Sequence, residues 1–157
     1  MTRTTAQCIR AAERVEMLAA ELYESLAVAF AEAPWLRDLF EGLAGEERQH
    51  AMRVRLLERH QGANAWLPEA MGTICRDLDA MAKELESTRA RFLLPGTLRS
   101  PTVVLEQVRE IERRFGSLHA EELARSASPE VARLFRSLAL QDERHRKLLE
   151  QALTRAA

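Results

Sequence analysis

The stretch LFEGLAGEERQH at residues 39–50 returns later in the chain as LFRSLALQDERH at residues 134–145. Five matched positions keep a constant offset of 95 residues: Phe40 with Phe135, Leu43 with Leu138, Ala44 with Ala139, Glu47 with Asp142 and His50 with His145. The segment before each stretch also corresponds, because Glu16 is followed seven residues later by Tyr23, and Glu112 by His119. This internal repeat predicts two helical hairpins that form a pseudo-symmetric four-helix bundle.

The rest of the chain favours an all-α fold. Gly and Pro are scarce and occur at a few places, whereas Ala, Leu, Glu and Arg dominate between them, so the breaks mark helix ends. The Ser-Pro pairs at 100–101 and 128–129 are typical of helix starts. Apolar periodicity between the breaks predicts five helices, over about residues 5–32, 34–60, 66–92, 101–125 and 129–153. We therefore expect one domain over residues 1–157, with a first hairpin over about 5–61, a crossover helix over about 66–92 and a second hairpin over about 100–154.

Composition excludes several classes of function. Lys and Arg total 23 and Asp and Glu total 24, a net charge of −1, so there is no basic excess for nucleic acid. The first residues contain no apolar stretch typical of a signal peptide, and no run reaches the roughly 18 apolar residues of a membrane span. We expect a cytoplasmic protein that binds neither nucleic acid nor membrane.

The two cysteines restrict the chemistry of any metal site. Cys8 and Cys75 lie far apart in the sequence and form no CxxC pair, which argues against a disulfide framework, a zinc site or iron bound by thiolates. Any metal would therefore be held by oxygen and nitrogen.

Polar side chains interrupt the apolar stripes of both hairpins. The carboxylate Glu16 falls in the stripe between Ala12 and Ala19, a position that faces the core. The same spacing places six residues in the predicted core: Glu16, Glu47, His50, Glu112, Asp142 and His145. Burying four facing carboxylates is costly unless something compensates their charge, and no Lys or Arg occupies the stripes near them. Two divalent cations would balance the four negative charges, so the pattern predicts a two-metal site.

The motifs resemble those of the rubrerythrin group within the ferritin-like superfamily. Residues 39–51 look like that group's LFxxLAxxExxHA segment, and residues 16–23 look like its ExxAxxxY helix. The resemblance covers both hairpins. It implies a ferritin-like bundle that binds two iron ions, one half of the site being Glu16, Glu47 and His50 and the other Glu112, Asp142 and His145. It also implies a reaction with dioxygen or hydrogen peroxide.

This chain departs from the group's pattern at three points. Asp142 stands where the group usually has Glu, and its side chain is one methylene shorter. Phe115 stands where rubrerythrin proper has an additional Glu, and the four cysteines of a rubredoxin iron centre are absent. Electrons would therefore come from a separate donor.

The leading hypothesis is a di-iron oxidoreductase, with manganese as an alternative metal because both ions accept similar ligands. Two rivals stay open: a ferroxidase that stores iron inside a cage, and a helical interaction module without metal. Tyr23 and His119 either hydrogen-bond a ligand carboxylate or are ordinary core residues. Trp35 and Trp66, near predicted loops, would suit a homodimer contact.

Overall fold

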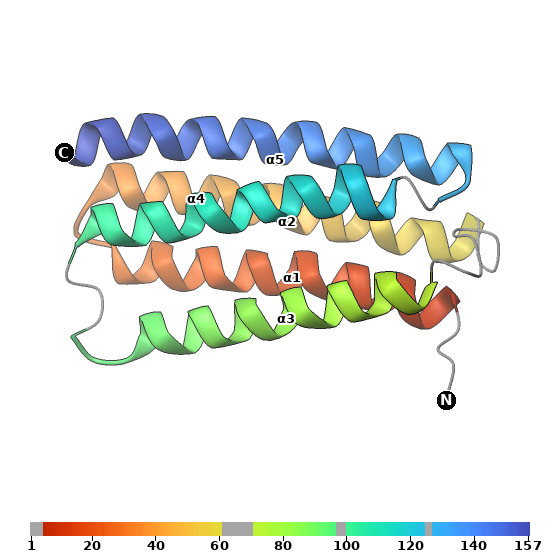
Figure 1. The fold of residues 1–157 in the computed structure, drawn as a ribbon. Helices are drawn as coiled ribbons and strands as arrows, with labels where there is room; N and C mark the ends of the chain where they lie inside the picture. Colours follow the sequence, from red (N-terminus) through yellow and green to blue (C-terminus); the bar gives the residue numbers. More distant parts are fainter. Residues whose placement is uncertain (1–4, 61–70, 97–99, 125–126) are drawn as a thin grey trace. The chain divides into compact units, whose positions relative to one another are not determined.

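The computed structural model describes residues 5–60, 71–96, 100–124 and 127–157 (Figure 1). Its regular elements there are all helical: α1 (Thr5–Ala29), α2 (Pro34–His60), α3 (Met71–Leu93), α4 (Pro101–Ser117), the π-helical turn η2 (Leu118–Leu123) and α5 (Pro129–Ala156). The all-α prediction is confirmed. The chain divides into two compact units, one of residues 1–97 and one of residues 98–157, and each is described by itself.

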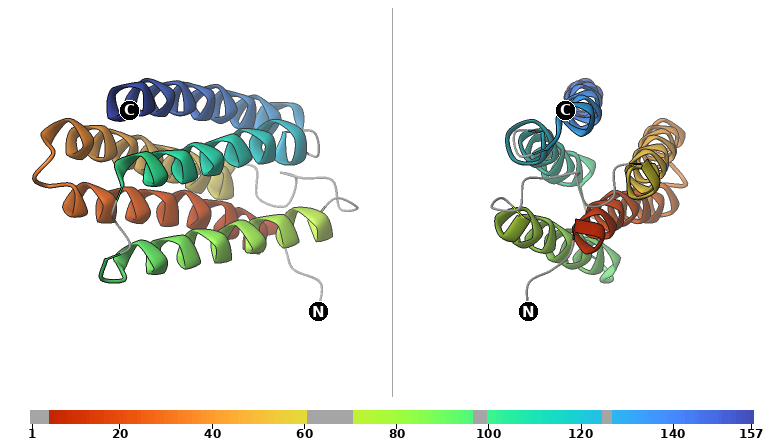
Figure 2. Two further views of the ribbon diagram at one scale, coloured as in Figure 1. Left: turned by 60° about the vertical axis from the view of Figure 1, so that its left-hand side comes forward. Right: turned by 90° about the vertical axis from the view of Figure 1, so that its right-hand side faces the viewer.

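In the first unit, α1 and α2 form the predicted hairpin, and α1 lies between α2 and α3 (Figure 2). The α1–α2 core contains aromatic side chains that the apolar stripe placed there. The Phe40 ring stacks on Tyr23, with ring centroids 6.4 Å apart, and on Phe30, with centroids 5.9 Å apart. Helix α1 ends at Ala29, three residues before the predicted end, and α2 has the predicted bounds.

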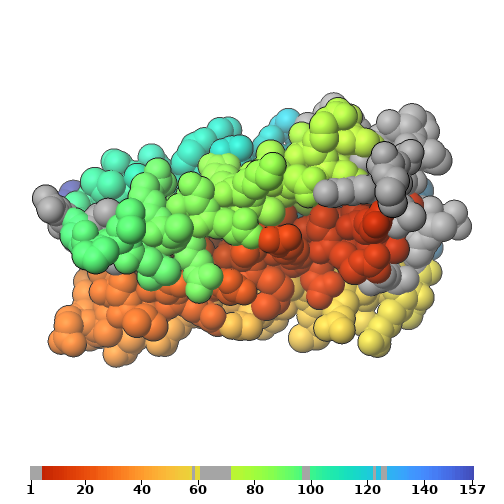
Figure 3. All heavy atoms as spheres, turned by 90° about the horizontal axis from the view of Figure 1, so that it is seen from below, coloured from red at the N-terminus to blue at the C-terminus, as the bar shows by residue number. Residues whose placement is uncertain are grey.

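Helix α3 carries the predicted amphipathic stripe and lies alongside α1 (Figure 3). Ile74, Leu78 and Leu85 are buried, whereas charged residues such as Lys83 and Glu86 are exposed. Its predicted start near residue 66, together with Trp66, lies outside the described residues. Trp35 is half-buried in the first turns of α2.

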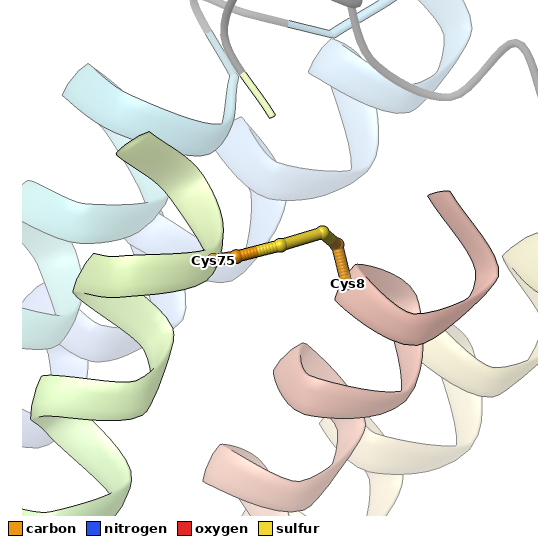
Figure 4. Close-up of a disulfide and its surroundings, with 2 residues drawn as sticks. All are labelled: Cys8 and Cys75. Atoms are coloured by element: carbon orange, nitrogen blue, oxygen red, sulfur yellow. A yellow bond between two sulfur atoms is a disulfide. The ribbon is translucent and has the colours of Figure 1, made fainter. Parts of the chain in front are cut away.

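The cysteine spacing argued against a disulfide framework, and the structure corrects this expectation, because the two cysteines are bonded to each other. Cys8 of α1 and Cys75 of α3 are joined Sγ to Sγ, with their Cα atoms 5.5 Å apart (Figure 4). The two residues are 67 positions apart in the sequence, but Cys75 follows Ile74 on the buried side of α3, next to the start of α1. Since both sulfurs are used in this bond, neither is a thiolate ligand for a metal.

The second unit is the hairpin of α4 and α5. Ser100 and Ser128 occupy the predicted N-cap positions, and a proline follows each; neither serine side chain makes a capping hydrogen bond. The backbone carbonyl of Ser128 accepts a hydrogen bond from the Ala132 N–H at 2.8 Å. Helix α5 continues to Ala156, beyond the predicted end.

The fourth helix, predicted to run to about residue 125, is helical to Leu123 but changes its type along the way. The α-helix ends at Ser117, and the chain continues as η2, in which the Ala124 N–H donates to the His119 carbonyl, five residues back, at 3.0 Å. The change follows Gly116 and Ser117, both weak helix formers.

Among the described helices, none combines the length and apolar character that a membrane crossing requires.

Candidate metal centre

The first unit brings together the three predicted ligands of its hairpin. Glu16 comes from α1, and Glu47 and His50 come from successive turns of α2. The Nδ1 atom of His50 lies 2.9 Å from Glu47 Oε2 and 3.6 Å from Glu16 Oε2. One ligand atom from each residue lies within 4.8 Å of those of the other two. We call Glu16, Glu47 and His50 the first triad.

The first triad is buried because its residues replace apolar side chains in the packed stripes. The exposed fractions of Glu16, Glu47 and His50 are 1%, 1% and 0%. Buried neighbours on the same faces, among them Ala12 and Leu43, exclude bulk water from the three side chains.

Electrostatics in the metal-free protein favour the charged imidazolium. Burial alone lowers the pKa of His50, because desolvation disfavours the charged form. Hydrogen bonds and charge attraction from Glu16 and Glu47 outweigh that effect and raise the pKa of His50 from 6.5 to about 10. Glu16 and Glu47 thus stabilise a positive charge on the His50 imidazole.

The second unit assembles the corresponding set from α4 and α5. Glu112, Asp142 and His145 are each about 1% exposed or less, and they offer ligand atoms within 4.8 Å of one another. The Nδ1 atom of His145 lies 3.3 Å from Glu112 Oε2. We call these three residues the second triad.

His119 contacts the second triad directly. Its Nδ1 lies 2.6 Å from Asp142 Oδ2, and both side chains are buried. The imidazole is held between two rings, with centroid distances of 5.9 Å to Phe115 and 5.8 Å to Phe135. His119 therefore lies within hydrogen-bonding distance of Asp142, the geometry that a role in orienting a ligand carboxylate would require.

The two units repeat a structural detail as well as a sequence motif. Tyr23, seven residues after Glu16, stacks on Phe40, just as His119 stacks on the matching Phe135. Tyr23 is fully buried in the first unit.

The donor sets suit a divalent transition metal. Each triad supplies two carboxylates and one imidazole, the oxygen and nitrogen ligands that iron, manganese and zinc accept. Geometry and donor chemistry together mean that these buried groups could hold a metal ion.

Sequence reasoning missed a pocket beside the second triad. It lies on the α4–α5 hairpin, has a volume of about 620 Å³ and has Glu112 in its wall. The available signal was the group of small residues Gly116, Ala120 and Ala139, which leave room between two helices.

Comparison of the chain with protein-family models, with curated proteins and with solved structures finds no match. The assignment of a function therefore depends on the chemistry of the two triads and the groups around them.

Proposed function

We propose that this protein is a ferritin-like, rubrerythrin-like di-iron or di-manganese carboxylate protein, an oxidoreductase that reacts with hydrogen peroxide or dioxygen. One observation carries the proposal: each unit buries the same triad, a carboxylate from one helix and a carboxylate-x-x-His pair from the next. Iron is the expected metal, and manganese is the alternative.

The two triads would act as the halves of one centre. The repeat at a constant offset of 95 supports this, because it relates the Glu47–His50 pair to the Asp142–His145 pair. Charge supports it as well, since four carboxylates and two neutral imidazoles would be neutralised by two divalent ions.

The chemistry divides between the metal and the protein. Bound Fe(II) ions would supply the electrons that reduce the oxidant. The triads would hold the ions, and His119 would fix the orientation of the Asp142 carboxylate through its hydrogen bond. Buried Phe115 and Phe135 would keep water from that side of the centre. A separate donor would restore the electrons.

The proposal is tested by loading the whole protein with Fe(II) without oxygen and then mixing it with dioxygen or hydrogen peroxide. We expect a rapid change in absorbance, and the faster oxidant identifies the substrate. Glu47→Ala and His145→Ala remove one ligand from each triad and should abolish the change. His60→Ala and Glu106→Ala are matched controls, because these residues are exposed on α2 and α4.

Other outcomes would replace the proposal. A folded protein that binds no divalent metal would support the metal-free interaction module. Assembly into a large cage that accumulates oxidised iron mineral would support the storage ferroxidase.

A further inference from the structure

The pocket on the α4–α5 hairpin is a candidate for a second kind of site. Its volume of about 620 Å³ lies within the range of small-molecule sites, roughly 300 to 1,000 Å³. It is lined by residues of α4, η2 and α5: Glu112, Arg113, Gly116, Ser117, Ala120, Glu121, Arg136, Ala139, Leu140, Glu143 and Arg146.

The pocket lies beside the second triad. Glu112 belongs to both the pocket wall and the triad, and its side chain is fully buried, so a molecule in the pocket would lie next to the part of α4 that carries this carboxylate. Gly116 contributes no side chain, and a Cβ there would be 3.8 Å from the Asp142 Cβ. Ala120 and Ala139 add only methyl groups, while Leu140, with 74% of its surface exposed, offers an apolar wall.

An ion pair bridges the matching helices of the first unit. Arg48 of α2 donates from Nε to Glu24 Oε1 of α1 at 2.9 Å and so bridges the two helices. When the triads are aligned, Glu24 corresponds to Ala120 and Arg48 to Glu143, a combination that cannot form this bridge. The repeat keeps the ligands but changes the residues that cover them.

The solvent-accessible charges of the lining favour an anion. Glu112 is buried, so the accessible charges are three arginines against Glu121 and Glu143, an excess of one positive charge. Arg113 is held by Glu110, and Arg146 by Glu143 and Glu150.

Arg136 is the cation of this lining that is available to a ligand. It makes no ion pair with any residue in the part of the chain that the structure describes. A guanidinium in this position can donate two parallel hydrogen bonds to a carboxylate.

We infer that this pocket binds a small organic carboxylate with a short apolar body, and that it is the entry of an organic substrate to the metal centre. Arg136 binds the carboxylate, and Leu140 and Ala139 pack against the apolar body. The role as substrate entry rests on the proposed function, whereas the binding site itself does not.

Binding is tested on the metal-free full-length protein with hexanoate, followed by amide NMR shifts. Hexylamine, which is positively charged, and hexanol, which is neutral, have a similar apolar chain and serve as matched probes. We expect hexanoate to shift the amides of Gly116, Ser117 and Leu140 and to bind more tightly than either matched probe.

Two pairs of variants locate the site. Ala120→Trp should fill the pocket and abolish the shifts, and Ala80→Trp on an exposed position of α3 should leave them unchanged. Arg136→Gln should weaken hexanoate about fivefold, as expected for one solvent-exposed ion pair, whereas Arg133→Gln on the same helix should not.

A second measurement tests the role as substrate entry independently of the binding site. In protein loaded with Mn(II), hexanoate protons should broaden strongly because the pocket touches Glu112. Absence of pocket shifts, or equal binding of hexylamine, overturns the carboxylate site. Hexanoate bound in the pocket without broadening, in protein that does hold Mn(II), overturns the role as substrate entry. Hexanoate binding in a protein that takes up no metal would support the site while the proposed function fails.

Discussion

At the scale of single residues, the proposed centre depends on how each imidazole lies among the carboxylates. In the first triad, Glu16 and Glu47 both attract the His50 imidazolium, and this attraction outweighs the cost of burying its charge. In the second unit, His119 holds Asp142, and His145 lies against Glu112. These contacts lead to three predictions about protons and metal.

The stability of the metal-free protein should fall with increasing pH. The pKa of His50 is raised from 6.5 to about 10, so its pairing contributes fully below about pH 6.5 and is lost as the pH rises through about 10. We expect the melting temperature of the wild type to fall between about pH 7 and pH 10 more steeply than that of His50→Gln. Parallel curves in circular dichroism melts would contradict this account of His50.

Metal affinity should change in the opposite direction. An ion that binds His50 must displace its proton, so affinity should rise by about tenfold per pH unit for each proton released. Competition with a metal-binding dye between about pH 6 and pH 9 measures this slope. An affinity independent of pH would mean that His50 is not a ligand.

His119→Phe tests the hydrogen bond to Asp142 without removing the aromatic stack. A phenyl ring retains the contacts with Phe115 and Phe135 but cannot bond the carboxylate. We expect metal affinity to fall by about tenfold or more, with helix content unchanged. His60→Phe, on an exposed position, is the control. Equal affinities in wild type and variant would show that His119 is only a core residue.

At the scale of helices, periodicity predicted most of what the structure contains. Glu16, Glu47 and Glu112 could be assigned to the core because they interrupt apolar stripes, and the bounds of α2 follow from Pro34 and the break after His60. The features that periodicity did not predict depend on local hydrogen bonding and on contacts between helices, which the apolar stripe of a single helix does not describe. The η2 turn is a local change of hydrogen bonding after Gly116, and the pocket results from small residues on two different helices.

The disulfide between α1 and α3 is a further feature that the sequence pattern did not predict. Cysteine spacing argued against a disulfide framework, and it could not reveal the pairing of Cys8 with Cys75, which depends on how α3 lies along α1. The link closes a loop across a sequence separation of 67, which constrains the unfolded chain.

We expect the double variant Cys8→Ala, Cys75→Ala to lose about 4 kcal/mol of stability by the loop-entropy relation. Metal content should not change, because neither sulfur is a ligand. Chemical denaturation measures the loss, and wild type with reduced cysteines should behave like the double variant. Free thiols in the native wild type, or unchanged stability in the double variant, would contradict the structure of this link.

At the scale of the whole molecule, two hairpins carry one repeated triad each and differ in what surrounds it. The first unit adds α3, the disulfide and the Glu24–Arg48 bridge. The second adds His119 on η2 and the pocket beside Glu112. The repeated part is the proposed ligand set, so the central claim is that the two triads serve one two-metal centre.

Titration of the metal-free protein with Mn(II), followed by electron paramagnetic resonance, tests that claim most directly. Ions that share bridging carboxylates, about 4 Å apart, are magnetically coupled. We predict about two Mn(II) per chain with the spectrum of a coupled pair, which Glu47→Ala should disrupt and Glu106→Ala should preserve. Two ions with the six-line spectrum of isolated Mn(II), or no specific binding, would contradict a shared centre.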